Sequence, residues 1–159
     1  MNAWTRTNLV LAGLAVVLLA LELWPGAGPA RHPLTGLDTE RINAVRIERD
    51  DRLQLALRRH DDGWRMTHPT DSAARPRRVA QLLGVARAQI VHDLGDADLA
   101  RYGLESPKAV LRLDALTIAF GDTDPTRQGR YVAIDGAVRV IDDVYYKLLT
   151  LPPRHFRGD

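Results

Sequence analysis

The longest apolar stretch of the sequence is Leu9–Leu23 (LVLAGLAVVLLALEL), bracketed by Trp4 and Trp24. A helix between the two tryptophans would be about 30 Å long at about 1.5 Å per residue, which is close to the hydrocarbon thickness of a bilayer. Tryptophan favours both membrane interfaces, and the only acid, Glu22, stands near the end of the run where its carboxylate reaches headgroup water. The stretch therefore predicts an N-terminal transmembrane signal-anchor over residues 1–24.

Two other interpretations of this stretch stay open. Arg6 and the following apolar run also fit a cleaved secretory signal, with Gly28-Pro29-Ala30 as a small-residue cleavage site that Pro29 suits poorly. A buried helix of a soluble protein is disfavoured because the run is apolar on all faces. Basic residues are nearly balanced across the span, but a short leading tail with one early span favours a signal-anchor. We expect bilayer contact over residues 4–24, a single-pass inner-membrane location and a periplasmic bulk of the chain.

The remaining sequence divides into a Pro/Gly linker at residues 25–33 and one domain at residues 34–159. A domain of this length can bury a substantial core. The formal net charge of the chain is +2, and arginine supplies all basic residues except Lys108 and Lys147. The absence of cysteine excludes disulfides, thiolate metal sites and cysteine nucleophiles.

The first half of the domain alternates apolar and polar residues over 45–48, 53–58 and 64–67. Asp50-Asp51 and Asp61-Asp62-Gly63 stand between these runs as turns, so the pattern predicts a three-stranded antiparallel meander. Apolar residues at helical spacing over 79–90 then predict an amphipathic helix, with several candidate N-caps in Pro69-Thr70-Asp71-Ser72.

The second half repeats this order of elements. A helical turn over 99–104 should stop at Gly103, and strands are predicted at 111–113, 116–120, 132–134 and 138–140. A last short helix is expected over 144–149, capped by Asp142 or Asp143. The expected fold class is α+β: an N-terminal transmembrane helix followed by a mainly antiparallel β domain with two to three helices, in β-meander–helix–β-meander–helix order.

Few residues are arranged for chemistry. The histidines form no metal-ligand pair and the serines no nucleophile elbow, so we expect no catalytic residue and no metal site. In the loop GDTDPTRQGR, Arg127 and Arg130 are candidate ligands for an anion that Gly129 would let approach the backbone. The cluster at 75–78 (RPRR) is read as a solvated helix face, because no aromatic platform for nucleic acid accompanies it.

Five short motifs give the domain a family resemblance. They are Leu34-Thr35-Gly36-Leu37, Asp62-Gly63-Trp64 with Pro69, Tyr102-Gly103-Leu104 with Pro107, Phe120-Gly121-Asp122, and Gly129-Arg130-Tyr131-Val132. In this order, over roughly residues 34–156, they resemble the domain-of-unknown-function 4340 family. The resemblance implies a membrane-tethered bacterial envelope domain, which in longer relatives is associated with ABC-transporter components. It implies no catalytic residue.

Together these observations predict a non-enzymatic, membrane-anchored envelope domain that acts as an accessory or scaffold module of an envelope or ABC-transporter-associated complex. The alternative is a periplasmic binding module for a small anionic ligand or an envelope polymer, and an enzyme with an unrecognised site ranks third. We expect a protein partner, no cofactor and no nucleic acid.

Overall fold

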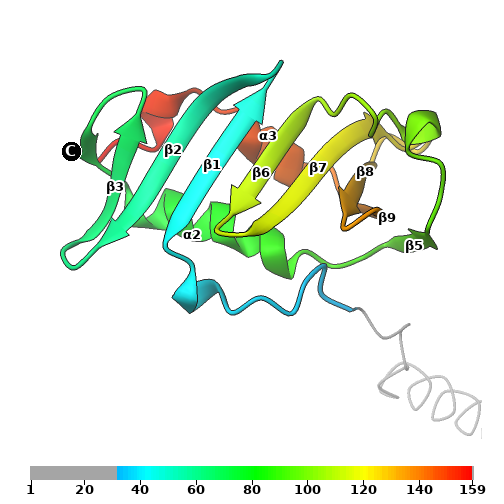
Figure 1. Ribbon diagram of the computed structural model, residues 1–159, viewed down its shortest axis with the longest axis horizontal. Coiled ribbons are helices and arrows are strands. Elements are labelled where there is room, and N and C mark those ends of the chain that lie inside the picture. The colour runs from blue at the N-terminus through cyan, green and yellow to red at the C-terminus, as the bar shows by residue number, and fades with distance from the viewer. Residues whose placement is uncertain (1–31, 159) are drawn as a thin grey trace, which may run out of the picture. The chain divides into compact units, whose positions relative to one another are not determined.

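Nine strands form one antiparallel sheet in residues 32–158, which are the residues that this computed structural model describes (Figure 1). The strand order across the sheet is β4-β3-β2-β1-β6-β7-β8-β9-β5. The strands are β1 (Ala44–Arg49), β2 (Arg52–His60), β3 (Gly63–His68), β4 (Ser72–Ala73), β5 (His92–Gly95), β6 (Ala109–Leu113), β7 (Leu116–Thr123), β8 (Gly129–Ile134) and β9 (Ala137–Asp142).

Tight turns and alternating side chains account for the two meanders, β1–β2–β3 and β6–β7–β8–β9. Asp50 and Asp51 both have positive φ between β1 and β2, as do Asp135 and Gly136 between β8 and β9. Positive φ at both central residues is the geometry whose twist matches that of antiparallel strands. The meanders become one sheet because β1 pairs antiparallel with β6, for example Arg46 with Arg112.

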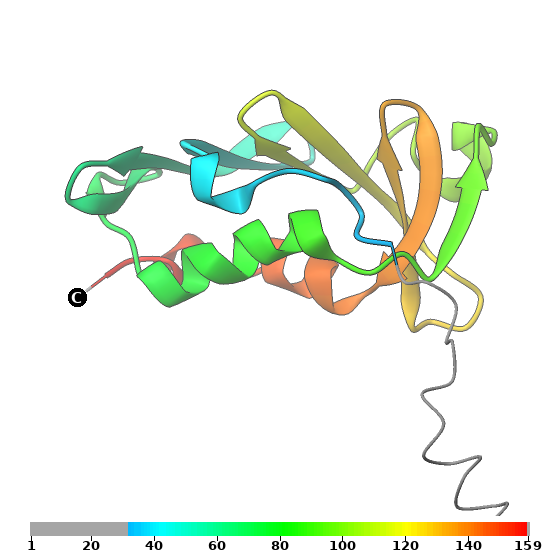
Figure 2. The same cartoon turned by 90° about the horizontal axis from the view of Figure 1, so that it is seen from below.

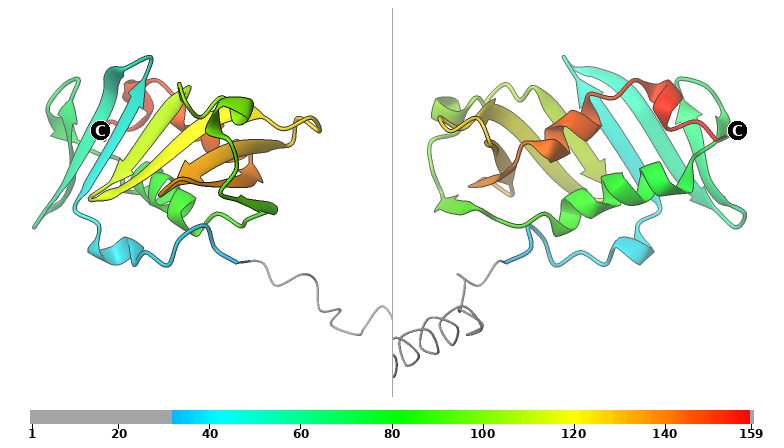
Figure 3. Two further views of the ribbon diagram at one scale, coloured as in Figure 1. Left: turned by 45° about the vertical axis from the view of Figure 1, so that its right-hand side comes forward. Right: turned by 180° about the vertical axis from the view of Figure 1, so that it is seen from behind.

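Two short α-helices pack on one face of the sheet (Figure 2, Figure 3). The helices are α2 (Pro76–Gly84) and α3 (Val144–Leu149), and the 3-10 turns are η1 (Thr39–Arg41), η2 (Val85–Arg87), η3 (Leu99–Tyr102) and η4 (Pro153–His155). Val79, Leu82 and Leu83 form the buried stripe of α2. They belong to the main core together with inward side chains such as Ile47 and Phe120. Each fully buried large apolar side chain contributes about 1.5–3 kcal/mol.

The opposite face of the sheet, called the outer face below, carries a smaller apolar cluster at its β8–β9 end. Leu104, Ala133 and Val138 are its buried members, and Tyr102 packs on Tyr131 with ring centroids 4.5 Å apart. Gly103, with φ of 66°, ends η3 and turns the chain back onto the sheet. Among the helices of residues 32–158, none lies across the rest of the outer face, over β1, β2, β3 and β6 (Figure 1).

The expected fold class needs correction. The described residues form mainly a nine-stranded sheet with two short helices, instead of seven strands in two blocks with two to three helices. The additional strands β4 and β5 have only two and four residues, so no alternation marks them in the sequence. Asp71, an expected helix cap, instead binds Arg65, and α2 begins after Arg75 without a side-chain cap.

The transmembrane part of that fold class is corrected as well. Within residues 32–158, no helix has both the length and the apolar character that crossing a bilayer requires. The segment 1–24, for which the signal-anchor is expected, and most of the linker 25–33 lie outside the described residues. The described residues therefore supply no transmembrane helix to that fold class.

Candidate anion-binding face

The two arginines singled out in the sequence stand on one hairpin but do not meet in one site. Arg127 is exposed at the tip between β7 and β8, with φ of 60°. Arg130 is in β8 and is only 7% exposed. The hairpin therefore presents one of the two guanidinium groups to solvent and buries the other.

Arg130 is bound on all sides by the protein itself. Its Nε donates to a carboxylate oxygen of Asp143 at 2.6 Å, and a terminal nitrogen donates to the carbonyl oxygen of Gly121 at 2.6 Å. Its guanidinium carbon lies 3.6 Å from the centroid of the Tyr146 ring. A guanidinium with these contacts ties β8 to β7 and α3 and is engaged before any ligand arrives.

Asp124 gives the same hairpin its loop geometry. Its carboxylate accepts hydrogen bonds from the hydroxyl of Thr126 at 2.8 Å and from the backbone amide of Gly129 at 3.0 Å. Partial desolvation opposes ionisation, but these bonds, with further backbone donors at Gln128 and Arg127, outweigh it and hold the pKa of Asp124 below its usual range. The loop is thus built around an internal carboxylate.

The basic cluster at the start of α2 lines a surface hollow. Arg75, Arg77, Arg78 and Gln81 surround it, and Arg78 donates to the Gln81 side-chain oxygen at 2.9 Å. Residues 32–158 contain no group of three or more His, Asp or Glu side chains placed to hold a metal ion.

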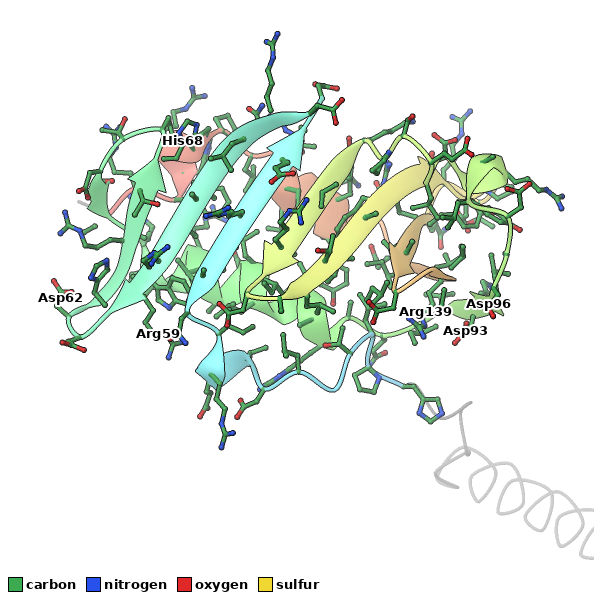
Figure 4. The ribbon with its side chains drawn as sticks, viewed as in Figure 1. Arg59, Asp62, His68, Asp93, Asp96 and Arg139 are labelled. Atoms are coloured by element: carbon green, nitrogen blue, oxygen red, sulfur yellow. The ribbon has the colours of Figure 1, made fainter. Side chains whose placement is uncertain are left out.

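A second group of arginines comes together only through the pairing of the strands. Arg46 of β1 lies directly opposite Arg112 of β6, and Arg58 of β2 lies directly opposite Arg65 of β3. Paired residues point to the same face of a sheet. Arg46 alternates with Val45 and Ile47, which are buried beneath the helices, so these arginines lie on the outer face. We call Arg46, Arg58, Arg65 and Arg112 the arginine face; Figure 4 views this side of the sheet, with His68 at its β3 end.

Two of the four arginines have acidic partners. Arg65 binds Asp71 through Nε at 3.2 Å and a terminal nitrogen at 2.7 Å, and this hydrogen-bonded carboxylate raises the pKa of Arg65 further above its usual value. Arg112 binds Glu48 at 3.3 Å. Within the described residues, the exposed guanidinium groups of Arg46 and Arg58 have no acidic partner.

The surface beside Arg46 and Arg112 is hollowed. Ala44, Arg46, Arg112 and Asp114 line one concavity. Asp114 stands at its rim, where its carboxylate accepts from the backbone amides of Asn43 at 3.1 Å and Ala44 at 2.8 Å. Its oxygens are therefore occupied by the backbone. The hollow is lined by two guanidinium groups, one small side chain and this carboxylate, and the guanidinium groups can donate to an oxyanion.

The sequence contained only part of the signal for this face. Alternation predicts that Arg46 and Arg58 point away from the core. It does not predict which residues of other strands lie beside them. The pairing of β1 with β6 joins residues 66 positions apart, Arg46 and Arg112. Such pairing depends on the whole sheet, so the convergence of the arginines could not be found by local patterns.

Comparison with known proteins assigns residues 64–157 to one family model, described as "Domain of unknown function (DUF4340)". The matched range begins in β3 and includes the motifs at Tyr102-Gly103-Leu104, Phe120-Gly121-Asp122 and Gly129-Arg130-Tyr131-Val132. It begins after the expected start of the resemblance, so Arg46 and Arg58 precede it. Neither the curated proteins nor the solved structures give a significant match.

Proposed function

The chain belongs to the domain-of-unknown-function 4340 family, and we propose that this member is a non-enzymatic binding module whose arginine face docks an anionic partner. The observation that carries this proposal is the pair of exposed guanidinium groups of Arg46 and Arg58, which have no acidic partner among the residues that the structure describes. Each has another arginine directly across from it.

This arrangement is unfavourable for the isolated domain. Like charges directly opposite on neighbouring strands destabilise a sheet, by a few tenths of a kcal/mol up to about 1 kcal/mol. Within residues 32–158, Glu48 and Asp71 bind one arginine of each opposing pair, and no acid lies within ion-pair distance of the other. An anionic partner would supply the missing counter-charges, so the bound state would remove repulsion that the free domain carries.

The chemistry of arginine also suits docking. Guanidinium groups form paired, charge-assisted hydrogen bonds with carboxylate or phosphate, each contributing about 1.5–3 kcal/mol when well formed. Positive charge over an open face further accelerates encounter with an anionic partner. The role is one of recognition, and it agrees with the accessory function expected from the family resemblance. The association with an envelope or ABC-transporter complex, and the location outside the cytoplasm, stay predictions.

A small anionic ligand is the second candidate. The hollow formed by Arg75, Arg77, Arg78 and Gln81 favours it, because three basic side chains surround one concavity. A ligand held there would be contacted mainly by α2, and would not depend on Arg46 or Arg58.

The test is a binding titration of the purified full-length chain with fluorescent poly-glutamate, followed by anisotropy at about 50 mM and about 300 mM salt. Arg46→Gln/Arg58→Gln should weaken binding at low salt at least about tenfold, which corresponds to about 1.4 kcal/mol. The matched control, Arg87→Gln/Arg101→Gln, removes the same charge from two exposed arginines elsewhere and should change the Kd less than about twofold.

A third variant, Arg77→Gln/Arg78→Gln, separates the two candidate sites. Loss of binding in this variant alone would assign the anion to the start of α2. If the arginine-face variant binds as well as its control, docking on this face is wrong.

A further inference from the structure

The partner of the arginine face can be specified further from the register of the sheet. This step rests on the proposed function above. Arg46 lies opposite Ala56, and Arg58 is two residues beyond Ala56 on the same strand; likewise Arg58 lies opposite Ala44. The two free arginines are therefore diagonal neighbours, whose Cα atoms are about 7–8 Å apart in antiparallel sheets.

The four arginines consequently form a stepped row across four strands. Arg65 and Arg58 are direct neighbours, Arg58 and Arg46 are diagonal neighbours, and Arg46 and Arg112 are direct neighbours. Directly opposite residues have Cα atoms about 4.5–5.5 Å apart, so the wide interval lies at the centre of the row, between the two free side chains.

An extended polypeptide matches that central interval. Its side chains at positions i and i+2 point to the same side and are about 6.4–6.8 Å apart, at about 3.2–3.4 Å per residue. Carboxylates at alternate positions would reach Arg58 and Arg46 together, and the adjoining acids could extend towards Arg65 and Arg112.

The residues beside the arginines favour this shape of partner. Ala44 lies directly opposite Arg58, and Ala56 lies directly opposite Arg46. Ala44 also forms part of the surface hollow. This concavity is lined by Ala44, Arg46, Arg112 and Asp114, so it lies beside Arg46 on the side of β6. An extended segment can settle into it, whereas a helix about 10–12 Å in diameter would touch only the arginine tips.

Nucleic acid is the less suitable polyanion for this face. Single strands are usually held by bases stacked on aromatic rings. In the described residues, the residues directly opposite the free arginines on the neighbouring strands are Ala44, Ala56, Arg65 and Arg112, none of which is aromatic. Tyr102 and Tyr131 instead pack against each other in the apolar cluster at the β8–β9 end.

We propose that the arginine face binds an extended acidic segment of a partner protein, with carboxylates at every second residue, across β2 and β1. The recognition element is the diagonal pair Arg46 and Arg58 above Ala44 and Ala56. The spacing of the carboxylates along the segment, in addition to their charge, determines which segment binds.

The experiment compares peptides of one composition and different spacing against the full-length chain. One peptide carries glutamates at alternate positions, a second carries the same glutamates in one block, and a third places them four residues apart as on one face of a helix. A single-stranded oligonucleotide is the fourth probe. We expect the alternating peptide to bind at least about fivefold more tightly than its isomers, which is the size of a modest coupling between two charged contacts.

A relocation variant tests the spacing without changing the charge. Ala44→Arg/Arg46→Ala moves one free arginine from the diagonal of Arg58 to the position directly opposite it. The variant should keep its circular dichroism spectrum and its affinity for poly-glutamate within about threefold, while the preference for the alternating peptide disappears.

The outcomes separate this inference from the proposed function. Equal binding of the three peptides, or tighter binding of the helical spacing, would overturn the extended-segment inference and leave an anionic partner in place. Preference for the oligonucleotide would overturn it in favour of nucleic acid. If no anion binds, the proposed function itself is wrong.

Discussion

At the scale of single residues, one buried cation determines how the last hairpin attaches to the domain. Arg130 joins β8 to Gly121 in β7, to Asp143 at the start of α3, and to the ring of Tyr146. Three separate segments thus converge on one side chain. Arg130, which the sequence offers as a candidate ligand for an anion, thus also holds the internal structure together.

Arg130→Leu should lower the free energy of unfolding by about 3–5 kcal/mol, because it leaves a nearly buried carboxylate without its main partner. Within residues 32–158, Lys147, at 3.8 Å, would be the one basic partner left to Asp143. Urea denaturation measures the change, and Arg127→Leu on the same hairpin should cost less than about 0.5 kcal/mol. Arg130→Leu/Asp143→Leu should recover part of the loss. If Arg130→Leu and Arg127→Leu lower the free energy of unfolding by the same amount, this account is wrong.

Asp124 makes the β7–β8 loop sensitive to acid. Its folded-state pKa lies below the unfolded-state value of about 3.9, so its contribution to stability is fully present above about pH 4. That contribution is lost as the pH falls through the lower, folded-state pKa. Asp124→Asn should therefore lower the unfolding free energy at pH 7 and show a smaller further loss in acid than the wild-type chain.

Denaturant titrations between about pH 7 and pH 2.5 measure this difference. The control is Asp61→Asn, an exposed turn residue whose carboxyl accepts no hydrogen bond within residues 32–158. If the unfolding free energies of the wild-type chain and of Asp124→Asn fall by the same amount as the pH is lowered, the Asp124 carboxylate does not make the loop sensitive to acid.

At the scale of elements, a close approach of backbone explains one of the family motifs. A Cβ added at Gly121 would collide with the carbonyl oxygen of Tyr102 and come within 2.9 Å of Leu104 Cγ. The motif Tyr102-Gly103-Leu104 therefore packs against β7 at a point where only glycine fits. The same contact holds the outer apolar cluster on the sheet.

Gly121→Ala should lower the melting temperature, with a cost of at least about 1–3 kcal/mol for the overpacked contact. The matched control is Gly84→Ala, the same chemical change at the end of α2, where an added Cβ meets nothing within 4 Å. In helical backbone this control should stabilise by about 0.5–1 kcal/mol. The melting temperatures of both variants are measured by thermal unfolding. If Gly121→Ala melts at the wild-type temperature, the close approach of Tyr102 does not explain the glycine.

The elements that could be predicted are those with strong local signals. The alternating strands, the Asp-Gly turns and the stop at Gly103 are confirmed, as is a short helix over 144–149. The helix expected over 79–90 is shorter, because α2 ends at Gly84 and a 3-10 turn follows to Arg87. Strands β4 and β5 were missed since only their partners β3 and β9 make them strands.

At the scale of the whole molecule, the candidate site depends on contacts that no local pattern contains. Arg46 and Arg58 could be predicted to face outward, but their relation to Arg112 and Arg65 follows from the strand order β3-β2-β1-β6. The apolar cluster under Tyr102 covers one end of the outer face and leaves the arginine face open. Topology therefore decides which polar residues meet: here it brings together four arginines, two of them paired with Glu48 and Asp71.

Arg46 and Arg58 should lower the stability of the folded chain while they favour the binding of an anion. Arg46→Gln/Arg58→Gln keeps most of each aliphatic stem and removes the repulsion from Arg112 and Arg65. We expect the unfolding free energy to rise by about 0.3–1 kcal/mol at low salt, and the gain to shrink at about 1 M salt, where the screening length is about 3 Å. Urea titrations at both salt concentrations measure it. If the double variant is less stable than the wild-type chain at low salt, these arginines support the fold, and their presence needs no anionic partner. If the double variant is more stable, if salt abolishes this gain, and if poly-glutamate binding is lost, the two charges are retained for a ligand.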